Sequence, residues 1–294
     1  MFSAGRIGKG HIEYLWNDKL GKAWKITSAV MSFYRYSLLL RSIHFDDFEF
    51  ETRQQKLQED RFAIVRELFD IINARFSEHF EPESELCIDE QLLAYRGRVA
   101  FKHFIPSKPA KYGFKVGALV DVQTRYTLIL EPYVGKQPNL DAAGRPNKFK
   151  VSTTPYDLVI RLMKKFVKGG RNLTGDNWFT SVELVRELLR LKTTYVGTIR
   201  KNKRAIQPEF QASLQKKILS SLFGFDSQIT LVSYVPKKKR SVLLLSSQHH
   251  NKIDAKSKKQ KKPEIITYYN STKFGVDCVD QMCESHSTAR ITRG

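Results

Sequence analysis

From about residue 85 onward, β-rich segments alternate with amphipathic helical segments, and this order constrains the fold more than any other feature of the sequence. A short apolar stretch, Leu86–Ile88, predicts a strand with Asp89 near its end. Two further β-rich runs, "YGFKVGALVDV" and "RYTLILEPYVG", predict a hairpin. Helices are predicted over "PYDLVIRLMKKFVKGG" and "SVELVRELLRLK", and strands within "RNLTGDNWFTS" and "TTYVGTIR".

The resulting order, β-β-β-α-β-α-β, is that of the ribonuclease-H-like fold. The first three strands are expected to be antiparallel, and the later strands, which alternate with helices, to be parallel. Right-handed crossovers then fix most of the topology, and the first and fourth strands should be neighbours. We therefore predict an α/β fold with a ribonuclease-H-like mixed sheet, divided into a first part at 85–202 and a last part at 263–294.

Two segments flank or interrupt this core. Residues 1–84 are expected to be helical, because "TSAVMSFYRYSLLLRSIHF" and "EDRFAIVRELFDIINARFSEHF" carry apolar residues at helical spacing, which predicts core-facing stripes. Residues 203–262 break the alternation with a second hairpin, "SQITLVSYV" and "SVLLLSS", joined by "PKKKR". We interpret 203–262 as a basic, β-rich insertion. After it we expect a short strand at "EIITYYN" and a helix from about Ser271.

The net charge of +20 indicates a polyanionic partner, most often nucleic acid. The charge is uneven: residues 201–262 contain 15 Lys and Arg against 3 Asp and Glu. A merely solvated basic surface is the alternative.

Other classes of protein are disfavoured by the sequence. Cys87, Cys278 and Cys283 provide neither a disulfide framework nor a zinc set, which fits a reducing compartment. No apolar run is long enough to span a membrane, and the N-terminus lacks the apolar region of a secretory signal.

Three aspartates occupy positions where this fold would bring them together. Asp89 lies on the first strand, Asp176 follows the fourth strand, and Asp277 lies on the late helix with Asp280 on the same face. Carboxylate oxygens without His or thiolate favour Mg²⁺ or Mn²⁺, and two such ions can activate a nucleophile and stabilise a leaving oxygen of a phosphodiester. On spacing alone, the alternative is that these three are ordinary surface acids, since the chain contains many others. Asp121 and Asp226 are interpreted as structural.

Several blocks in this chain resemble the piggyBac transposase family. They occur in the family's order from about residue 28 to the C-terminus: "CIDEQLLAYRGR", "FIPSKPAKYGFKV", "GDNWFTS", "GTIRKNKR", "LVSYVPKK" and "YYNSTKFGVDCVDQMC". The resemblance implies a DDE/D recombinase that uses two Mg²⁺ or Mn²⁺ ions. Its catalytic aspartates match Asp89, Asp176 and Asp277, and a further metal-binding aspartate matches Asp280.

The same resemblance implies cleavage at transposon ends, hairpin formation and joining at TTAA targets. Residues 1–84 would form the first half of a split dimerisation and DNA-binding domain, and 203–262 the family's insertion domain. The implied partners are DNA and a second copy of the chain. No zinc is expected in this chain, and the nucleus is the expected location.

Basic residues in two regions are candidates for DNA-phosphate contacts. As single residues they could equally form a solvated edge, and the basic runs could also be nuclear-import signals. The candidates are Arg96, Arg98, Lys102, Lys108, Lys111, Lys115, Lys237, Lys238, Lys239 and Arg240. Trp178 and Phe179, directly after Asp176, are interpreted mainly as core residues rather than base-stacking ones.

The C-terminal "STARITRG" departs from the family pattern, because Gly294 stands where a Trp is expected. This predicts a truncation that removes half of the dimerisation domain and weakens a homodimer. Two functions follow: a transposase core whose carboxylates still assemble, or a catalytically incompetent DNA-binding protein of transposon origin.

Overall fold

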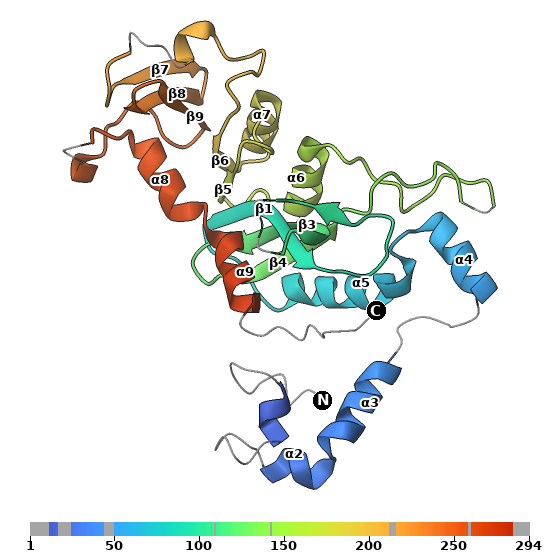
Figure 1. Cartoon of the computed structure of the whole chain (residues 1–294). Coiled ribbons are helices and arrows are strands. Elements are labelled where there is room, and N and C mark those ends of the chain that lie inside the picture. The colour runs from blue at the N-terminus through green and yellow to red at the C-terminus, as the bar shows by residue number, and fades with distance from the viewer. Residues whose placement is uncertain are drawn as a thin grey trace.

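The computed structural model describes residues 12–16, 25–43, 50–106, 108, 110–141, 143–211, 216–257 and 260–284. Its centre is a mixed sheet with strand order β2-β3-β1-β5-β6-β9-β8-β7, and β4 also pairs with β3 (Figure 1). Strands β1 (Glu85–Ala94), β3 (Tyr112–Asp121) and β4 (Thr127–Pro132) are antiparallel, and the short β2 (His103–Phe104) joins the edge of β3.

Strands β5 (Asn172–Gly175) and β6 (Thr194–Thr198) continue the sheet parallel to β1. Helix α6 (Pro155–Met163) leads into β5, and α7 (Val182–Arg190) connects β5 to β6. The predicted neighbours β1 and β5 pair from Glu85↔Asn172 to Ile88↔Gly175. The ribonuclease-H-like order predicted from the sequence is therefore confirmed.

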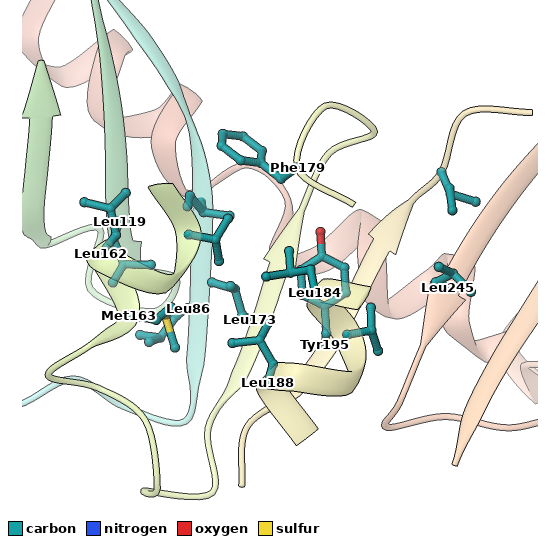
Figure 2. Close-up of a cluster of buried hydrophobic side chains, with 14 of the residues drawn as sticks. Leu86, Leu119, Leu162, Met163, Leu173, Phe179, Leu184, Leu188, Tyr195 and Leu245 are labelled. Carbon is teal, nitrogen blue, oxygen red and sulfur yellow. The ribbon is translucent and has the colours of Figure 1, made fainter. Parts of the chain in front are cut away.

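Both crossover helices begin at a hydroxyl side chain that caps the first turn. The Thr154 hydroxyl accepts a hydrogen bond from the Asp157 amide with Pro155 in the first turn, and the Ser181 hydroxyl accepts one from the Leu184 amide. Their apolar faces bury a core against the sheet, shown in Figure 2, that includes Leu86, Leu119, Leu162, Leu173 and Tyr195.

The segment after β6 extends the same sheet. Strands β7 (Ser221–Asp226), β8 (Ile229–Lys237) and β9 (Arg240–Ser246) form an antiparallel group, and β9 pairs with β6 through Val196↔Ser246 and Thr198↔Leu244. The hairpin predicted at "PKKKR" is confirmed. Short 3-10 turns at Pro208–Phe210 and Ala255–Ser257 flank this group. The domain limits at 203 and 262 stay a prediction.

The strand predicted at "EIITYYN" is wrong, because these residues form helix α8 (Glu264–Thr272). Ile265 and Ile266 are buried against Val196 and Leu244, and Tyr268 and Tyr269 pack beside them, which is helical rather than alternating burial. Helix α9 (Gly275–Glu284) follows after two residues, and both helices run along one side of the sheet (Figure 1).

The N-terminal segment is helical as predicted, with elements Ile12–Trp16, α2 (Lys25–Val30), α3 (Phe33–Ser42), α4 (Phe50–Glu59) and α5 (Ala63–Glu78). Helix α5 is tied to β4 by Asn73, whose side chain donates to the Leu130 carbonyl and accepts from the Leu130 amide, both at 2.8 Å. The single helix expected around residue 30 is divided, because Ser32 caps α3.

The predicted burial of the N-terminal apolar stripe is only partly correct. Tyr36 is buried, whereas Val30, Tyr34 and Leu38 are exposed in the described structure. None of the helices in the described ranges could cross a bilayer.

Candidate active site

Asp89 lies where β1 leaves its parallel partner. The last β1–β5 pair is Ile88↔Gly175, and Asp89 is the next residue, so it lies in the middle of a ten-residue strand rather than near its end. Side chains alternate along a strand, and Cys87 packs against Val276 and Val279 of α9. Asp89 therefore shares the face of the sheet that α9 covers. Its Oδ1 accepts a hydrogen bond of 2.7 Å from the Glu90 amide.

Asp176 follows β5 directly and reaches the same face. Thr174, two residues earlier, forms a 2.8 Å hydrogen bond with Thr272 of α8, which fixes that face of β5 under α8. The Trp178 amide donates to Asp176 Oδ1 at 2.8 Å. The Thr180 hydroxyl donates to the Asp176 carbonyl at 2.7 Å and shares a hydrogen bond with the buried Tyr195 hydroxyl. The turn that carries Asp176 is thus anchored to the core.

Helix α9 supplies the third carboxylate through a close approach to β1. A Cβ at Gly275 would lie 2.9 Å from Cys87 Cβ, so this position has no room for a side chain. Val276 and Val279 bury one face of α9 against Cys87, Ala118 and Val120. Asp277 and Asp280 follow these valines by one residue each and lie on the adjacent face, as the i,i+3 spacing predicts.

Asp89, Asp176 and Asp277 line one pocket of about 160 Å³. Its wall also includes Thr174, Tyr269, Lys273 and Phe274 from the β5 end and the α8–α9 connection. The structure thus brings together the three aspartates predicted from positions 89, 176 and 277. Asp280 does not line this pocket. Its catalytic and metal-binding role, like those of the other three, stays a prediction.

Burial raises the pKa of three of these carboxyl groups. Burial, and then the charges of Asp176 and Asp277, raise the pKa of Asp89 to about 7, against the opposing effect of the Glu90 amide. Burial also raises the pKa of Asp176 and of Asp280. A site with these properties favours a bound cation, because a cation would stabilise the ionised forms.

A lysine side chain pairs with two of these carboxylates in the described structure. Lys108 Nζ lies 3.7 Å from Asp277 Oδ1 and 3.6 Å from Asp280 Oδ2. In this arrangement, no group of three or more His, Cys, Asp or Glu side chains in the described ranges is close enough to hold a metal ion.

The donor set nevertheless has the chemistry of a Mg²⁺ or Mn²⁺ site. The candidate metal ligands that line the pocket are three aspartate carboxylates, and the described residues of its wall include no His. Cys87, the one thiol in the wall, is buried, donates to the Lys273 carbonyl at 3.4 Å, and has its pKa raised to about 12 by burial. Hard oxygen donors are what these two ions prefer.

Residues next to the aspartates have structural roles. Phe179 is buried in the main core, as predicted, and Trp178 is partly buried against it. Lys115 lies 4.1 Å above the Trp178 ring and forms an ion pair with Glu90. Asp121, interpreted as structural, accepts from the amides of Glu83 and Thr124 and so holds the turn after β3. Asp226 pairs with Arg186.

The candidate DNA-contacting cations lie along the sheet edge where β1, β5 and β6 end. Residues 95–111 connect the end of β1 to the start of antiparallel β3. The turn at 237–240 is on the same edge, because β9 runs antiparallel to β6 and begins beyond it. The exposed ones are Arg96, Arg98, Lys111, Lys237, Lys238, Lys239 and Arg240. Lys102 donates to the Gly97 carbonyl, while Lys108 and Lys115 are paired with acids.

Sequence reasoning missed four further cations at this edge. Arg200, Lys201, Lys203 and Arg204 follow β6 and are exposed, and Arg200 Nε donates to Asn177 Oδ1 at 3.1 Å, directly beside Asp176. The basic run "RKNKR", which begins at the last residue of the predicted strand "TTYVGTIR", is the signal that identifies them. We call these four residues the β6 basic loop.

Comparisons with known proteins agree with this geometry. The family model described as Transposase IS4 matches residues 1–293. The human PiggyBac transposable element-derived protein 3 is 24% identical over 97% of this chain and 48% of its own length. The human chimeric ERCC6-PGBD3 protein is also 24% identical, over 97% of this chain and 27% of its own.

A cryo-EM structure of the piggyBac transposase synaptic complex with hairpin DNA superposes with a TM-score of 0.83 at 34% identity. It covers 100% of this chain and 59% of that one. The chain thus spans about half the length of the human PiggyBac-derived relative. By the family model, the ordered motifs and the shared fold, the chain belongs to the piggyBac family of transposases.

Proposed function

We propose that this chain is the catalytic core of a DNA transposase that cleaves strands at transposon ends and joins them to TTAA targets. The observation that supports this most directly is the pocket lined jointly by Asp89, Asp176 and Asp277, which come from a strand, a strand end and a late helix. The similarity to a transposase solved in a synaptic complex with hairpin DNA gives independent support.

In this proposal Asp89, Asp176 and Asp277 hold two Mg²⁺ or Mn²⁺ ions, and Asp280 assists from the adjacent face of α9. DDE transposases generally use divalent metal ions. When bound, such ions activate the attacking oxygen and stabilise the leaving oxygen of a phosphodiester. The protein's own part is positioning: the Glu90 and Trp178 amides orient the Asp89 and Asp176 carboxylates, and the packing of Val276 and Val279 sets the position of α9.

DNA is the proposed partner, and the basic edge is the proposed contact surface. Arg200, one of the exposed cations there, donates to Asn177 next to Asp176, so a DNA backbone neutralised by these cations would pass close to Asp176. We further propose assembly of two copies on DNA and a nuclear location, on the basis of the family to which the chain belongs.

The decisive experiment is a nicking assay on a transposon-end duplex with Mg²⁺. We expect strand cleavage by the unmodified chain and its loss in Asp176→Asn, a near-isosteric change that removes one carboxylate. Asp226→Asn is the matched control, since Asp226 is exposed, lies on β7 and pairs with Arg186. Cleavage by Asp176→Asn equal to that of the unmodified chain would exclude the proposal.

A second candidate is a DNA-binding protein without strand chemistry. The observation that favours it is that, in the described ranges, no three acidic, His or Cys side chains lie close enough together to bind a metal ion. It predicts salt-sensitive duplex binding by the unmodified chain with no cleaved product at any Mg²⁺ or Mn²⁺ concentration. A detected strand-transfer product would eliminate it.

A further inference from the structure

A lysine occupies the position where two of the carboxylates converge. Lys108 Nζ lies within 4 Å of both Asp277 and Asp280, and its side chain is only 22% exposed. Asp277 is itself 51% exposed and Asp280 32% exposed, so the lysine is the least exposed of the three charged groups. Its ammonium is therefore directed inward, toward the acids, rather than toward solvent.

The backbone holds Lys108 in this position. It lies in the connection between β2 and β3, where the Lys108 amide donates to the Ile105 carbonyl at 3.1 Å and the Lys111 amide donates to the Lys108 carbonyl at 3.1 Å. The Ile105 amide in turn donates to the Lys111 carbonyl at 2.8 Å, and Lys111 has a left-handed φ of 54°. A closed turn thus presents Lys108 to α9.

The α9 side of the contact is equally fixed. Val276 and Val279 anchor the helix on β1 and β3, and the buried Gln91 side chain of β1 partly opposes the rise in the pKa of Asp280. Asp277, in contrast, belongs both to this contact and to the wall of the carboxylate pocket. The ammonium and a pocket-bound ion would therefore compete for the same carboxylate.

We propose that Lys108 is a built-in counter-cation of the carboxylate site, which holds Asp277 and Asp280 in the metal-free protein and is displaced when a divalent cation binds. The inference rests on the proposed function. An ammonium and a divalent ion a few ångströms apart repel each other, so binding of the ion requires the ammonium to leave Asp277. Lys108 thereby sets the metal affinity of the site and keeps its acids compensated between turnovers.

The first test is Mn²⁺ binding, measured by the loss of the free-Mn²⁺ paramagnetic resonance signal. We expect Lys108→Met to bind Mn²⁺ about five- to tenfold more tightly than the unmodified chain, because both competition and repulsion are removed. Lys108→Arg keeps the charge and should bind like the unmodified chain. Lys102→Met is the matched control for Mn²⁺ binding from the same connection, since its ammonium donates to the Gly97 carbonyl, and it should leave the Mn²⁺ affinity unchanged.

The second test uses the unmodified chain and does not depend on the folding of a variant. Reductive methylation of lysine amines, followed site by site with mass spectrometry, reports how accessible each ammonium is. Saturating Mn²⁺ should increase the labelling rate of Lys108 severalfold and leave that of Lys102 unchanged. Unchanged labelling of Lys108 at saturating Mn²⁺ would overturn the proposal.

The outcomes separate this inference from the function it rests on. If Asp277→Asn weakens Mn²⁺ binding but Lys108→Met binds no more tightly than the unmodified chain, the counter-cation role is refuted and the metal site stands. If neither the unmodified chain nor Lys108→Met binds Mn²⁺ in a way that depends on Asp277, the proposed metal site itself fails, and the inference fails with it.

Discussion

Asp89 is a partly buried carboxylate, and burial disfavours its ionised form. Burial is the largest cause of its raised pKa, about 7 instead of 3.8, and the nearby aspartates add to it. Such a group lowers stability when ionised, so its retention in the metal-free fold has a measurable cost.

The sign of this cost predicts a pH dependence. Between about pH 4 and 7 the unfolded chain has lost the Asp89 proton while the folded chain retains it, so stability falls as pH rises through this window, and the penalty is complete above pH 7. In chelator-treated protein, Asp89→Asn should therefore melt about 2–4 °C higher than the unmodified chain at pH 8, the effect of ~1 kcal/mol in a chain of this size.

At pH 4 the same two proteins should melt together, because Asp89 is then largely protonated when folded. Asp226→Asn, which removes an exposed carboxylate, serves as the control and should give a similar difference at both pH values. Thermal unfolding followed by circular dichroism measures both comparisons. Equal melting temperatures for Asp89→Asn and the unmodified chain at pH 8 would show that ionised Asp89 does not destabilise the fold.

The residue-scale contents of the site were only partly predictable. The positions of Asp89, Asp176 and Asp277 follow from topology, since neighbouring strand ends and a late helix meet on one face. The partners of Lys108 do not follow, because nothing in "FIPSKPAKYGFKV" shows that its turn folds back onto a helix more than 160 residues later. The sequence marked Lys108 as a phosphate contact, whereas the described structure pairs it with Asp277 and Asp280.

At the scale of elements, α9 determines whether the carboxylates meet. Its first turn lies so close to β1 that a Cβ at Gly275 would contact Cys87 and approach Val120 Cγ1 at 3.6 Å. Cys87 is buried in the strand, and its backbone pairs with Val120 on one side and Thr174 on the other, so β1 cannot retreat. The helix would have to shift instead.

Gly275→Ala should thus lower the free energy of unfolding by about 1–3 kcal/mol through overpacking. It should also weaken Mn²⁺ binding, because the shift displaces Asp277. Gln281→Ala, an exposed substitution on the same helix, should change neither. Urea unfolding and Mn²⁺ titration of the two variants provide the measurement, and full stability in Gly275→Ala would mean that the α9–β1 approach is not tight.

The one element predicted with the wrong type, α8, lies beside this helix. "EIITYYN" is rich in β-branched and aromatic residues, which favours a strand by local propensity. Burial of Ile265 and Ile266 on β6 and β9, and the Thr174–Thr272 hydrogen bond, override that propensity. The crossover helices α6 and α7 were predictable because their caps and apolar spacing agree with their tertiary contacts.

At the scale of the whole molecule, the strand order places several basic segments at the edge of the sheet that carries the aspartates. The connections after β1 and β6 and the β8–β9 turn all leave the sheet at this edge, so the cations of these three segments lie on the side that carries the pocket. The sequence predicted which segments are basic, but only strand pairing shows that segments a hundred residues apart share an edge.

This arrangement predicts an uneven salt dependence of DNA binding. Replacing Arg200, Lys201 and Lys203 of the β6 basic loop with Ala should weaken binding to a 25-bp duplex. It should also reduce the slope of log K against log salt by about 2 to 3, because each phosphate contact contributes about 0.9 to that slope. Fluorescence anisotropy at several salt concentrations measures both quantities.

The matched control removes the same charge from the opposite edge. Helices α6 and α7 return from the carboxyl ends of the strands, so Lys164, Lys165 and Arg190, at and beyond their C-termini, lie where β5 and β6 begin. Replacing these three with Ala lowers the net charge equally, and the slope should change by less than about 1, since few phosphates reach that edge. Equal losses in the two triple variants would mean that DNA responds to total charge and not to the edge beside Asp176.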